Sequence, residues 1–293
     1  MCLFFCYTDP FPSPGRFKLI LIMNRDEYFD RTTSPAEWED GILCGRDTFC
    51  EIHGGGTWCG MNKKGRIGIL TNIFEGQGAK HLASRGSLVT DYLKFQGFKS
   101  PMDYMKDITS SGTLYKPYNL ILMEQNAKTG SYELFYCAQG LNDRLLATRD
   151  GPRKLTNNHS CLGNHFLRRP FLKTMAMDEE IMEFIEEHNT VQNKENIIRN
   201  LYDIFGTRYS YFPDPEIEKL KYSDDFLMKN DKYIACPYIT HSNYKGRSYG
   251  TRSQTIILID YYDEVSYYET TRHFNPQTKE EHYSKVIEEF KLL

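Results

Sequence analysis

The chain has 293 residues, of which 36 are basic and 39 acidic, so its formal net charge at pH 7 is -3. This near-neutral balance, without a Lys/Arg tract, gives a nucleic-acid partner little electrostatic support, and we expect none. Apolar residues make up 40% and charged residues 26%, which indicates a globular chain rather than a disordered or fibrous one.

The first two apolar segments, residues 2–7 and 17–23, are each about as long as a β-strand. Neither approaches the ~20 apolar residues that a membrane-spanning helix needs, and the first lacks the basic leader of a secretion signal. Both predict buried strands, joined by a connector rich in proline. We therefore expect no transmembrane segment and no secretion, and at most a transient association with a membrane or organelle.

The pattern of apolar residues along the rest of the chain predicts alternating groups of strands and helices. The predicted strands are residues 57–60, 67–71, 118–124, 132–137, 255–260 and 265–270, with a hairpin turn at 62–65. The predicted helices are residues 88–95, a short one that opens at Pro101, 170–188, 194–205 and 279–292. The stretches around 213–215 and 223–232 are polar and carry no predicted element.

These elements predict an α+β fold in one domain that spans residues 1–293. The strands are joined by hairpins rather than by regular crossover helices, which favours antiparallel sheets with helices packed outside them. No internal repeat and no Gly/Ser linker divides the chain. A doubly wound fold is disfavoured because no glycine-rich turn follows the first strand.

The eight cysteines occupy positions 2, 6, 44, 50, 59, 137, 161 and 236. They form neither the CxxC spacing of a zinc knuckle or redox dithiol nor a compact disulfide framework. We expect six or seven of them to be buried free thiols. Free thiols fit a reducing compartment, which favours the cytoplasm or the mitochondrial matrix over secretion.

Cys2 is the first residue of the first predicted strand. Removal of Met1 would place its thiol beside a free α-amine, whose pKa of about 7.7–8.0 lets it act as a base near neutral pH. A thiol with an ordinary pKa of about 8.5 then needs little help to become a nucleophile. The alternative is a core cysteine at a strand end.

Asn24, Arg25, Asp26 and Glu27 directly follow the second predicted strand. An arginine near a thiol lowers the pKa of that thiol, and an aspartate can orient an α-amine. Pairing of the first two strands would bring this cluster close to Cys2. The alternative is a turn in which the Asn and Asp cap backbone groups and the Arg pairs with the Glu.

Three further polar residues stand beside apolar strands. Asn72 and Asn164 each end an apolar segment, and Arg252 comes shortly before the strand at 255–260. The amide of Asn72 could donate to a developing oxyanion. Each residue alone is more often a turn or cap residue, but their shared position at strand ends with Cys2 predicts one site.

Several short motifs run in order along almost the whole chain: Met1-Cys2, Asn24-Arg-Asp-Glu27, Gly55-Gly-Thr-Trp-Cys-Gly60, Leu70-Thr-Asn72, Pro213-Asp-Pro215 and Tyr249-Gly-Thr-Arg-Ser-Gln-Thr-Ile-Ile-Leu-Ile-Asp260. Together they resemble the transport and Golgi organisation protein 2 family, also called the NRDE family, and the motifs at 24–27 and 55–60 are the specific part of the match. That family is similar in turn to N-terminal-nucleophile hydrolases of the penicillin V acylase and bile salt hydrolase type. The resemblance implies a four-layer αββα sandwich of antiparallel sheets.

The same resemblance implies roles for individual residues. It places the nucleophile at Cys2, the supporting Arg and Asp at Arg25 and Asp26, and the oxyanion Asn at Asn72. It also places a second Asn at Asn164 and a late Arg at Arg252. Ligand-binding residues are expected at Asn24, Arg25, Asp26, Glu27, Thr57 and Trp58. The chain departs from the hydrolases in its adjacent Arg-Asp pair, and from relatives in reading Cys-Leu-Gly-Asn at 161–164 where Gly-Leu-Ser-Asn is common.

The family resemblance implies intracellular heme trafficking, as a heme chaperone or exporter-like protein of storage organelles or mitochondria, or a role in acyl-coenzyme A and lipid homeostasis. Cytoplasmic residence with association to mitochondria or Golgi would fit these roles. The hydrolase likeness implies an alternative, a cysteine amidohydrolase or thioesterase that uses Cys2. The eight histidines form no ligation motif and no CxxCH sequence is present, so we expect no metal site and no covalently bound cofactor. Heme or acyl-coenzyme A would be a bound or transported ligand, held in a pocket with Tyr- and Phe-rich walls.

Overall fold

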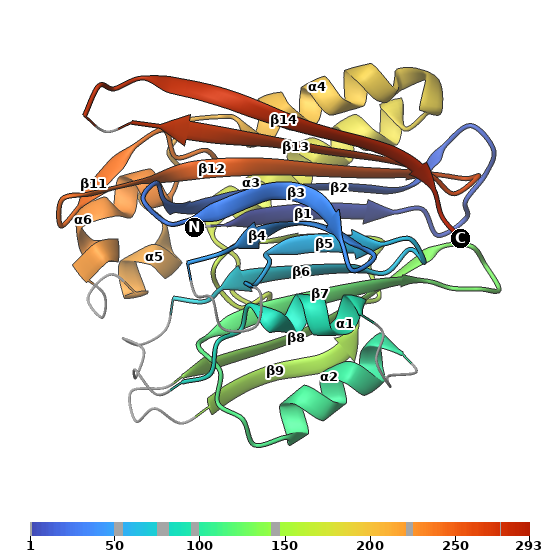
Figure 1. Cartoon of the computed structure of the whole chain (residues 1–293), viewed down its shortest axis with the longest axis horizontal. Coiled ribbons are helices and arrows are strands. Elements are labelled where there is room, and N and C mark those ends of the chain that lie inside the picture. Colours follow the sequence, from blue (N-terminus) through green and yellow to red (C-terminus); the bar gives the residue numbers. More distant parts are fainter. Residues whose placement is uncertain are drawn as a thin grey trace.

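The computed structural model describes residues 2–49, 55–74, 82–94, 100–141, 147–220, 225–275 and 277–293. Within these ranges the chain forms two antiparallel sheets of seven strands each, and helices pack on their outer faces (Figure 1). The predicted α+β class is therefore confirmed.

The first sheet combines strands from the two ends of the chain. Its order is β10-β1-β2-β12-β13-β14, and β11 pairs with β12. In β1 and β2, Leu3 lies opposite Asn24, which confirms the predicted pairing of the first two strands. The strands are β1 (Leu3–Thr8), β2 (Phe17–Tyr28), β10 (His159–Leu162), β11 (Ser242–Tyr244), β12 (Arg247–Asp260), β13 (Glu264–Phe274) and β14 (Glu281–Lys291).

The second sheet is a meander in which each strand pairs with the next along the chain. Its hairpin between β5 and β6 turns at Gly65, whose φ of +79° favours glycine. This is the turn predicted at 62–65. The strands are β3 (Thr33–Glu39), β4 (Ile42–Asp47), β5 (Cys59–Asn62), β6 (Ile67–Asn72), β7 (Tyr118–Gln125), β8 (Tyr132–Leu141) and β9 (Ala147–Lys154).

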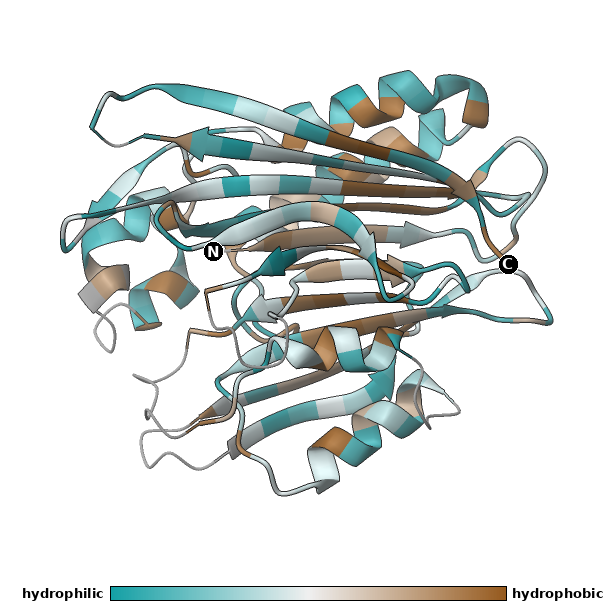
Figure 2. Cartoon of the chain, viewed as in Figure 1, coloured by the Kyte–Doolittle hydropathy of each residue, from teal (hydrophilic) through white to brown (hydrophobic). Residues whose placement is uncertain are grey.

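Strand β2 shows why the central strands are apolar without alternation. Leu19 and Leu21 face the second sheet in the core between the sheets, whereas Ile20 and Ile22 face outward into a second core. Both faces of the strand are thus covered, and each fully buried Ile or Leu contributes about 1.5–3 kcal/mol. Figure 2 shows the resulting apolar stretches along the central strands.

Helices complete four layers. α3 (Leu172–His188) and α4 (Lys194–Phe205) cover the outer face of the first sheet, and α1 (Ser87–Leu93) and α2 (Pro101–Ser110) cover that of the second (Figure 1). Ser100 caps α2 by accepting a hydrogen bond from the Asp103 backbone N–H at 3.1 Å, and Pro101 occupies its first position, as predicted. The expected αββα sandwich is confirmed.

The predicted helix at residues 279–292 is wrong, because this segment is the strand β14. Val286 and Phe290 pack against the core between the sheets, and Phe290 contacts the ring of Trp38 at 5.0 Å between centroids. Apolar residues four positions apart fit one face of a strand as well as one face of a helix. Pairing with β13 along its full length decides for the strand.

Other boundaries also differ from the prediction. β2 continues to Tyr28, so Asn24–Glu27 lie inside the strand rather than after it. The polar stretches contain α5 (Pro215–Leu220) and α6 (Asp225–Ile234), and the strands β3, β4, β9, β10 and β11 were not predicted. Phe95, expected in the helix at 88–95, lies outside the described residues. No helix in the described ranges is both long enough and apolar enough to cross a membrane.

Candidate functional site

A cavity of about 560 Å³ opens where strand ends from both sheets meet. Small-molecule ligands occupy pockets of about 300–1,000 Å³, so its size suits such a ligand. Basic, acidic and apolar side chains share its wall. The wall includes Cys2, Arg25, Asp26, Glu27, Arg31, Asp47, Thr57, Trp58, Leu70, Asn72, Arg85, Tyr115 and Lys116.

Arg25 joins the two sheets at the wall of this cavity. Its guanidinium carbon lies 4.1 Å from the centre of the Trp58 ring, and its Nη2 donates to Asp47 Oδ2 at 3.0 Å. Arg25 is buried, and a buried guanidinium needs such partners because its desolvation is costly. Stacking and ion pairing together fix its orientation.

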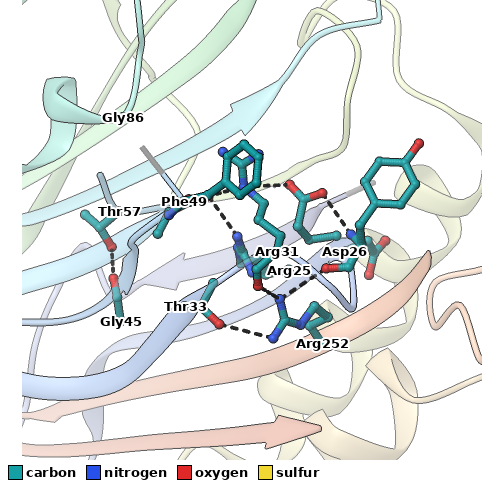
Figure 3. A network of polar contacts seen from close by, with 12 residues as sticks. Arg25, Asp26, Arg31, Thr33, Gly45, Phe49, Thr57, Gly86 and Arg252 are labelled. Atoms are coloured by element: carbon teal, nitrogen blue, oxygen red, sulfur yellow. Dashed lines mark hydrogen bonds and ion pairs between the residues drawn. The ribbon is translucent and has the colours of Figure 1, made fainter. Parts of the chain in front are cut away.

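Asp47 is the anionic centre of a small network that includes Arg25 and Arg31, which Figure 3 labels. Its Oδ2 also accepts a hydrogen bond from Arg31 Nε at 2.6 Å. Arg31 lies 3.6 Å from Glu27 Oε2, and its guanidinium carbon stacks over Phe49 at 4.6 Å from the ring centre. One carboxylate thus holds two arginines at the cavity.

Asp26 and Cys2 meet at the base of the cavity. Thr251 Oγ1 donates to Asp26 Oδ1 at 2.6 Å, and the Tyr249 hydroxyl donates to the Asp26 backbone carbonyl at 3.2 Å. Burial raises the pKa of the Cys2 thiol, and the charge of Asp26 acts in the same direction. Arg25 and a hydrogen bond from the Asp26 backbone N–H oppose this shift without reversing it, so Cys2 is a neutral thiol at pH 7.

Asn72 and Asn164 are adjacent, but they differ in their access to the cavity. Asn72 lines it, at the end of β6. Asn164 is buried behind it and donates from Nδ2 to the Asn72 backbone carbonyl at 2.7 Å. Asn164 therefore supports Asn72 rather than lining the described cavity.

Asn24 does not line the cavity. Its Nδ2 donates to the backbone carbonyls of Phe205 at 2.9 Å and Pro237 at 3.0 Å, and its Oδ1 accepts from Gln254 Nε2 at 3.0 Å. These bonds tie β2 to the end of α4 and to the segment after α6. The placement of Asn24 is that of a fully bonded core amide, whereas Arg25, Asp26 and Glu27 line the cavity.

Arg252 also lies outside the cavity wall. It sits at a β-bulge, where the register between β12 and β2 shifts between Thr251 and Ser253. Its guanidinium donates to the backbone carbonyls of Tyr28 and Arg31 and to Thr33 Oγ1 (Figure 3). Burial lowers the pKa of Arg252 to about 10, so it stays charged at pH 7 and holds the turn that carries Arg31.

Thr57 and Trp58 reach the cavity through a tight backbone arrangement. Thr57 Oγ1 lies 2.7 Å from the carbonyl oxygen of Gly45, to which it donates. A Cβ on Gly45 would lie 2.7 Å from the Trp58 ring, so the indole needs a glycine there. Likewise a Cβ on Gly56 would lie 2.5 Å from Gly86 Cα, which lets the start of α1 close the wall.

A model of the family described as transport and Golgi organisation 2 matches residues 1–274 of the chain. The chain belongs to this family. Transport and Golgi organisation 2 homologues of Mus musculus and Homo sapiens are each 30% identical to it, over 275 and 276 residues that cover 92% of both chains. The Drosophila melanogaster protein is 25% identical over 281 residues, with the same coverage. The family resemblance predicted from the motifs is confirmed.

Two solved structures similar to this member of the transport and Golgi organisation 2 family are variants of a conjugated bile acid hydrolase from Clostridium perfringens. One, a mutant with alanine in place of a cysteine, aligns with a TM-score of 0.43 and 10% identity, covering 99% of this chain and 97% of its own. The other, a variant with leucine in place of an arginine, aligns with a TM-score of 0.36 and 11% identity, covering 99% and 93%. Similarity at this level does not extend to activity.

Six charged residues that the sequence prediction missed lie at or beneath the site. Arg31, Asp47, Arg85 and Lys116 line the cavity, and none of them belongs to a motif that marks it. Lys173 is fully buried, donates to the backbone carbonyls of Ile234 and Cys236, and has its pKa lowered by burial. Glu269 is buried between the sheets beneath Trp58, and burial raises its pKa to about 7.

The cysteines and histidines make no metal centre in the part of the chain that the structure describes, where no group of three His, Cys, Asp or Glu side chains could hold an ion. The seven described cysteines are free and buried, as expected. Cys50, His53 and His81 lie outside the described residues.

Proposed function

We propose that the cavity binds an amphipathic anion, heme or acyl-coenzyme A, and that the protein handles this cargo inside the cell. The observation that carries the proposal is a pair of basic residues at the wall, Arg85 and Lys116, that form no ion pair with any described residue. Arg85 Nη1 donates to the Pro117 carbonyl at 2.7 Å, a neutral acceptor, and the carboxylates of Glu27 and Asp47 act on its charge without forming an ion pair with it.

The charge of Arg85 persists at neutral pH. Burial lowers its pKa to about 10, which is still well above 7. A half-buried guanidinium without an ion-pair partner is costly to desolvate, and an anionic ligand would offset that cost. Arginine suits this task because its planar fork can hold a carboxylate or phosphate with two hydrogen bonds.

The remaining wall supplies an apolar surface. Trp58, Leu70 and Tyr115 line the same cavity as the basic residues. Heme combines an apolar ring with carboxylates, and acyl-coenzyme A combines an acyl chain with phosphates, so both present the same pairing of apolar body and anionic groups. The combination of an apolar body with anionic groups, which heme and acyl-coenzyme A share, supports the proposal. A binding experiment distinguishes the two ligands.

The test is a titration of the single-tryptophan variant Trp38→Phe, which leaves Trp58 as the fluorescent reporter. Heme, palmitoyl-coenzyme A, free coenzyme A and palmitate are added separately, with heme also followed by its Soret band. We expect saturable quenching by heme or palmitoyl-coenzyme A, and binding weakened about tenfold by Arg85→Gln, since a charge-assisted hydrogen bond contributes about 1.5–3 kcal/mol.

Arg199→Gln is the matched control, because Arg199 is an exposed arginine of α4 away from the cavity. Its affinity should equal that of the parent. Absence of saturable binding by both cargoes, or equal loss in the Arg85 and Arg199 variants, would contradict the proposal. Binding of heme alone or of palmitoyl-coenzyme A alone identifies the cargo.

A cysteine amidohydrolase or thioesterase is the second candidate, and the convergence of Cys2, Arg25, Asp26 and Asn72 on one cavity favours it. The Cys2 thiol would pass its proton to its own α-amine as its sulfur forms a bond to the substrate carbonyl carbon, while Asn72 holds the oxyanion. The carbon–nitrogen or carbon–sulfur bond would then break, with a proton passing from the α-amine to the leaving group. Water would release the acid and restore the thiol.

This candidate requires a free α-amine on Cys2, because burial keeps the thiol protonated at pH 7 without a base. Intact mass of the purified protein tests whether Met1 is lost. Turnover of a panel of amides and thioesters, abolished by Cys2→Ala, is the result expected of the enzyme. Retention of Met1 together with the absence of turnover would exclude it.

A further inference from the structure

A second cavity, of about 300 Å³, lies at the edge strand β10 of the first sheet, beside the first turns of α3. None of the residues that line the first cavity lines this one. Its polar wall comes from β10 and α3, and its apolar wall from the segments that flank them. The wall includes His159, Ser160, Cys161, Thr174, Met175 and Asp178.

Two buried oxygen atoms on the α3 side of this wall find no hydrogen-bond partner within the described ranges: Thr174 Oγ1 and Asp178 Oδ1. Thr174 is 2% exposed. A buried polar group without a partner costs about 1–3 kcal/mol, so two such atoms one helical turn apart are expensive for the fold alone. Thr174 and Asp178 stand one helical turn apart, which places them on the same face of α3.

The second cavity has one basic and one acidic side chain in its wall, His159 and Asp178, and their charges cancel. His159 Nε2 lies 3.4 Å from Asp178 Oδ2, and His159 Nδ1 lies 3.1 Å from Asn158 Oδ1. An acceptor at each ring nitrogen favours the imidazolium form, and the hydrogen bond to Asp178 raises the pKa of His159. Among the residues that the structure describes, no other acidic or basic side chain lines this cavity. The wall is therefore neutral and favours an uncharged occupant.

The chemistry of the wall favours binding over catalysis. Burial raises the pKa of Cys161 well above its usual range, so the residue is a neutral thiol. Ser160 lies opposite Cys6, which faces the core between the sheets, whereas Cys161 lies opposite Phe5 in the outer core. His159 and Ser160, as neighbours in a strand, thus point to opposite faces, and no serine–histidine relay forms.

We propose that this second cavity binds a neutral small molecule with an aliphatic part and hydroxyl or amide groups. Its polar groups would donate to Asp178 Oδ1 and exchange a hydrogen bond with the Thr174 hydroxyl. Its aliphatic part would contact Met175 and the apolar side chains of Leu155, Leu167 and Pro170. Among the described residues no Phe, Tyr or Trp lines this cavity, and the His159 ring is held by Asp178 and Asn158, so the wall offers no broad aromatic surface to a flat ring.

The test uses methyl-labelled methionine and NMR. 1,2-Pentanediol and pentanamide are the neutral probes, and pentylammonium and pentanoate are charged molecules of similar size. We expect the Met175 methyl signal, assigned with Met175→Leu, to move saturably with the neutral probes. The signal of Met61, buried between the sheets, should stay in place. Equal binding of the charged molecules, or no saturable shift with either neutral probe, overturns the proposal.

Thr174→Val separates a ligand site from an accidental void, because it removes an unpartnered hydroxyl and keeps the side-chain shape. Probe binding should weaken about three- to tenfold, the usual contribution of one hydrogen bond, while thermal stability stays equal or rises. Thr174→Ser keeps the hydroxyl and should keep the affinity. Ser242→Ala is the matched control, since Ser242 is buried and its Oγ is equally unpartnered, but it lies outside this cavity. Unchanged affinity in Thr174→Val, or an equal loss in Ser242→Ala, overturns the proposal.

Discussion

Arg25 and Trp58 lie face to face, with the guanidinium carbon 4.1 Å from the centre of the indole ring. Arg25 belongs to β2 of the first sheet, and Trp58 directly precedes β5 of the second. The contact therefore joins the two sheets at the wall of the first cavity. Lysine cannot replace it in full, because an ammonium is a point charge without a plane to stack.

Arg25→Lys should lower the free energy of unfolding by about 1–2 kcal/mol, since the stacking is lost while a positive charge remains near Asp47. Urea unfolding followed by circular dichroism measures the change. Arg199→Lys, at an exposed position, should stay within about 0.5 kcal/mol of the parent. Equal stability of the two variants would show that the stacked geometry contributes nothing.

Two residues of the Asn24–Glu27 motif should respond in different ways. Asn24→Ala leaves two backbone carbonyls and the Gln254 amide without a partner, so it should lower the free energy of unfolding by about 2–3 kcal/mol. Glu27→Gln keeps an acceptor for the Tyr28 N–H and should change stability little.

The same two variants differ in the expected effect on cargo. Glu27→Gln removes a negative charge from the cavity wall and should tighten binding of an anionic ligand several-fold at low salt, with the gain reduced at high salt. Asn24→Ala should leave the affinity of the folded protein unchanged. Fluorescence titration of both variants checks this, and weaker anion binding by Glu27→Gln would contradict the charge argument.

Gly45→Ala should displace the Trp58 ring, because the added Cβ would lie 2.7 Å from one of its carbons. We expect a loss of about 1–3 kcal/mol in the free energy of unfolding, as for other overpacked sites. A double-mutant cycle with Trp58→Phe measures the interaction free energy between positions 45 and 58, because the smaller ring of Phe leaves room for the methyl group that Gly45→Ala adds. Additive effects of the two substitutions would locate the strain elsewhere.

The sequence predicted the layers of the sandwich better than its last strand. Continuous apolar runs mark strands that are covered on both faces, and these identified β1, β2 and β12. The contact between Phe290 and Trp38, which places β14, joins residues far apart in the chain. Local periodicity at Val286 and Phe290 fits a helix equally well, so it could not decide.

For the candidate site, local motifs pointed to Cys2 and the charged residues of β2, which line the cavity, but they could not separate cavity residues from the residues that support them. In the sequence, Asn24 and Arg252 are polar residues beside apolar strands, just as Arg25 is. In the structure, however, Asn24 is hydrogen-bonded within the core, and Arg252 is hydrogen-bonded to the turn that carries Arg31. Asp47 and Arg85 come from distant segments that the fold brings together. That distinction depends on strand register and bulges rather than on residue type.

Glu269 makes stability depend on pH. It is buried between the sheets, where its carboxyl accepts from the Ala36 backbone N–H at 2.8 Å and from Thr255 Oγ1 at 3.4 Å. Burial raises its pKa from 4.5 to about 7, and the charge of Arg25 only partly opposes this. Because the folded protein holds this proton more tightly than the unfolded chain does, the stabilisation is complete below pH 4.5. It is lost as the pH rises through about 7.

Glu269→Gln should therefore be about as stable as the parent at pH 4.5 and more stable at pH 8, by on the order of 2–3 kcal/mol. The amide keeps an acceptor for the Ala36 N–H and never ionises. Urea unfolding at several pH values between 4.5 and 8 measures the difference. Glu264→Gln on the same strand is the control, since Glu264 is exposed and its ion pair with Lys291, at 3.4 Å, is a surface contact. Parallel stability curves for the parent and Glu269→Gln would mean that Glu269 ionises in the folded protein at its ordinary pKa.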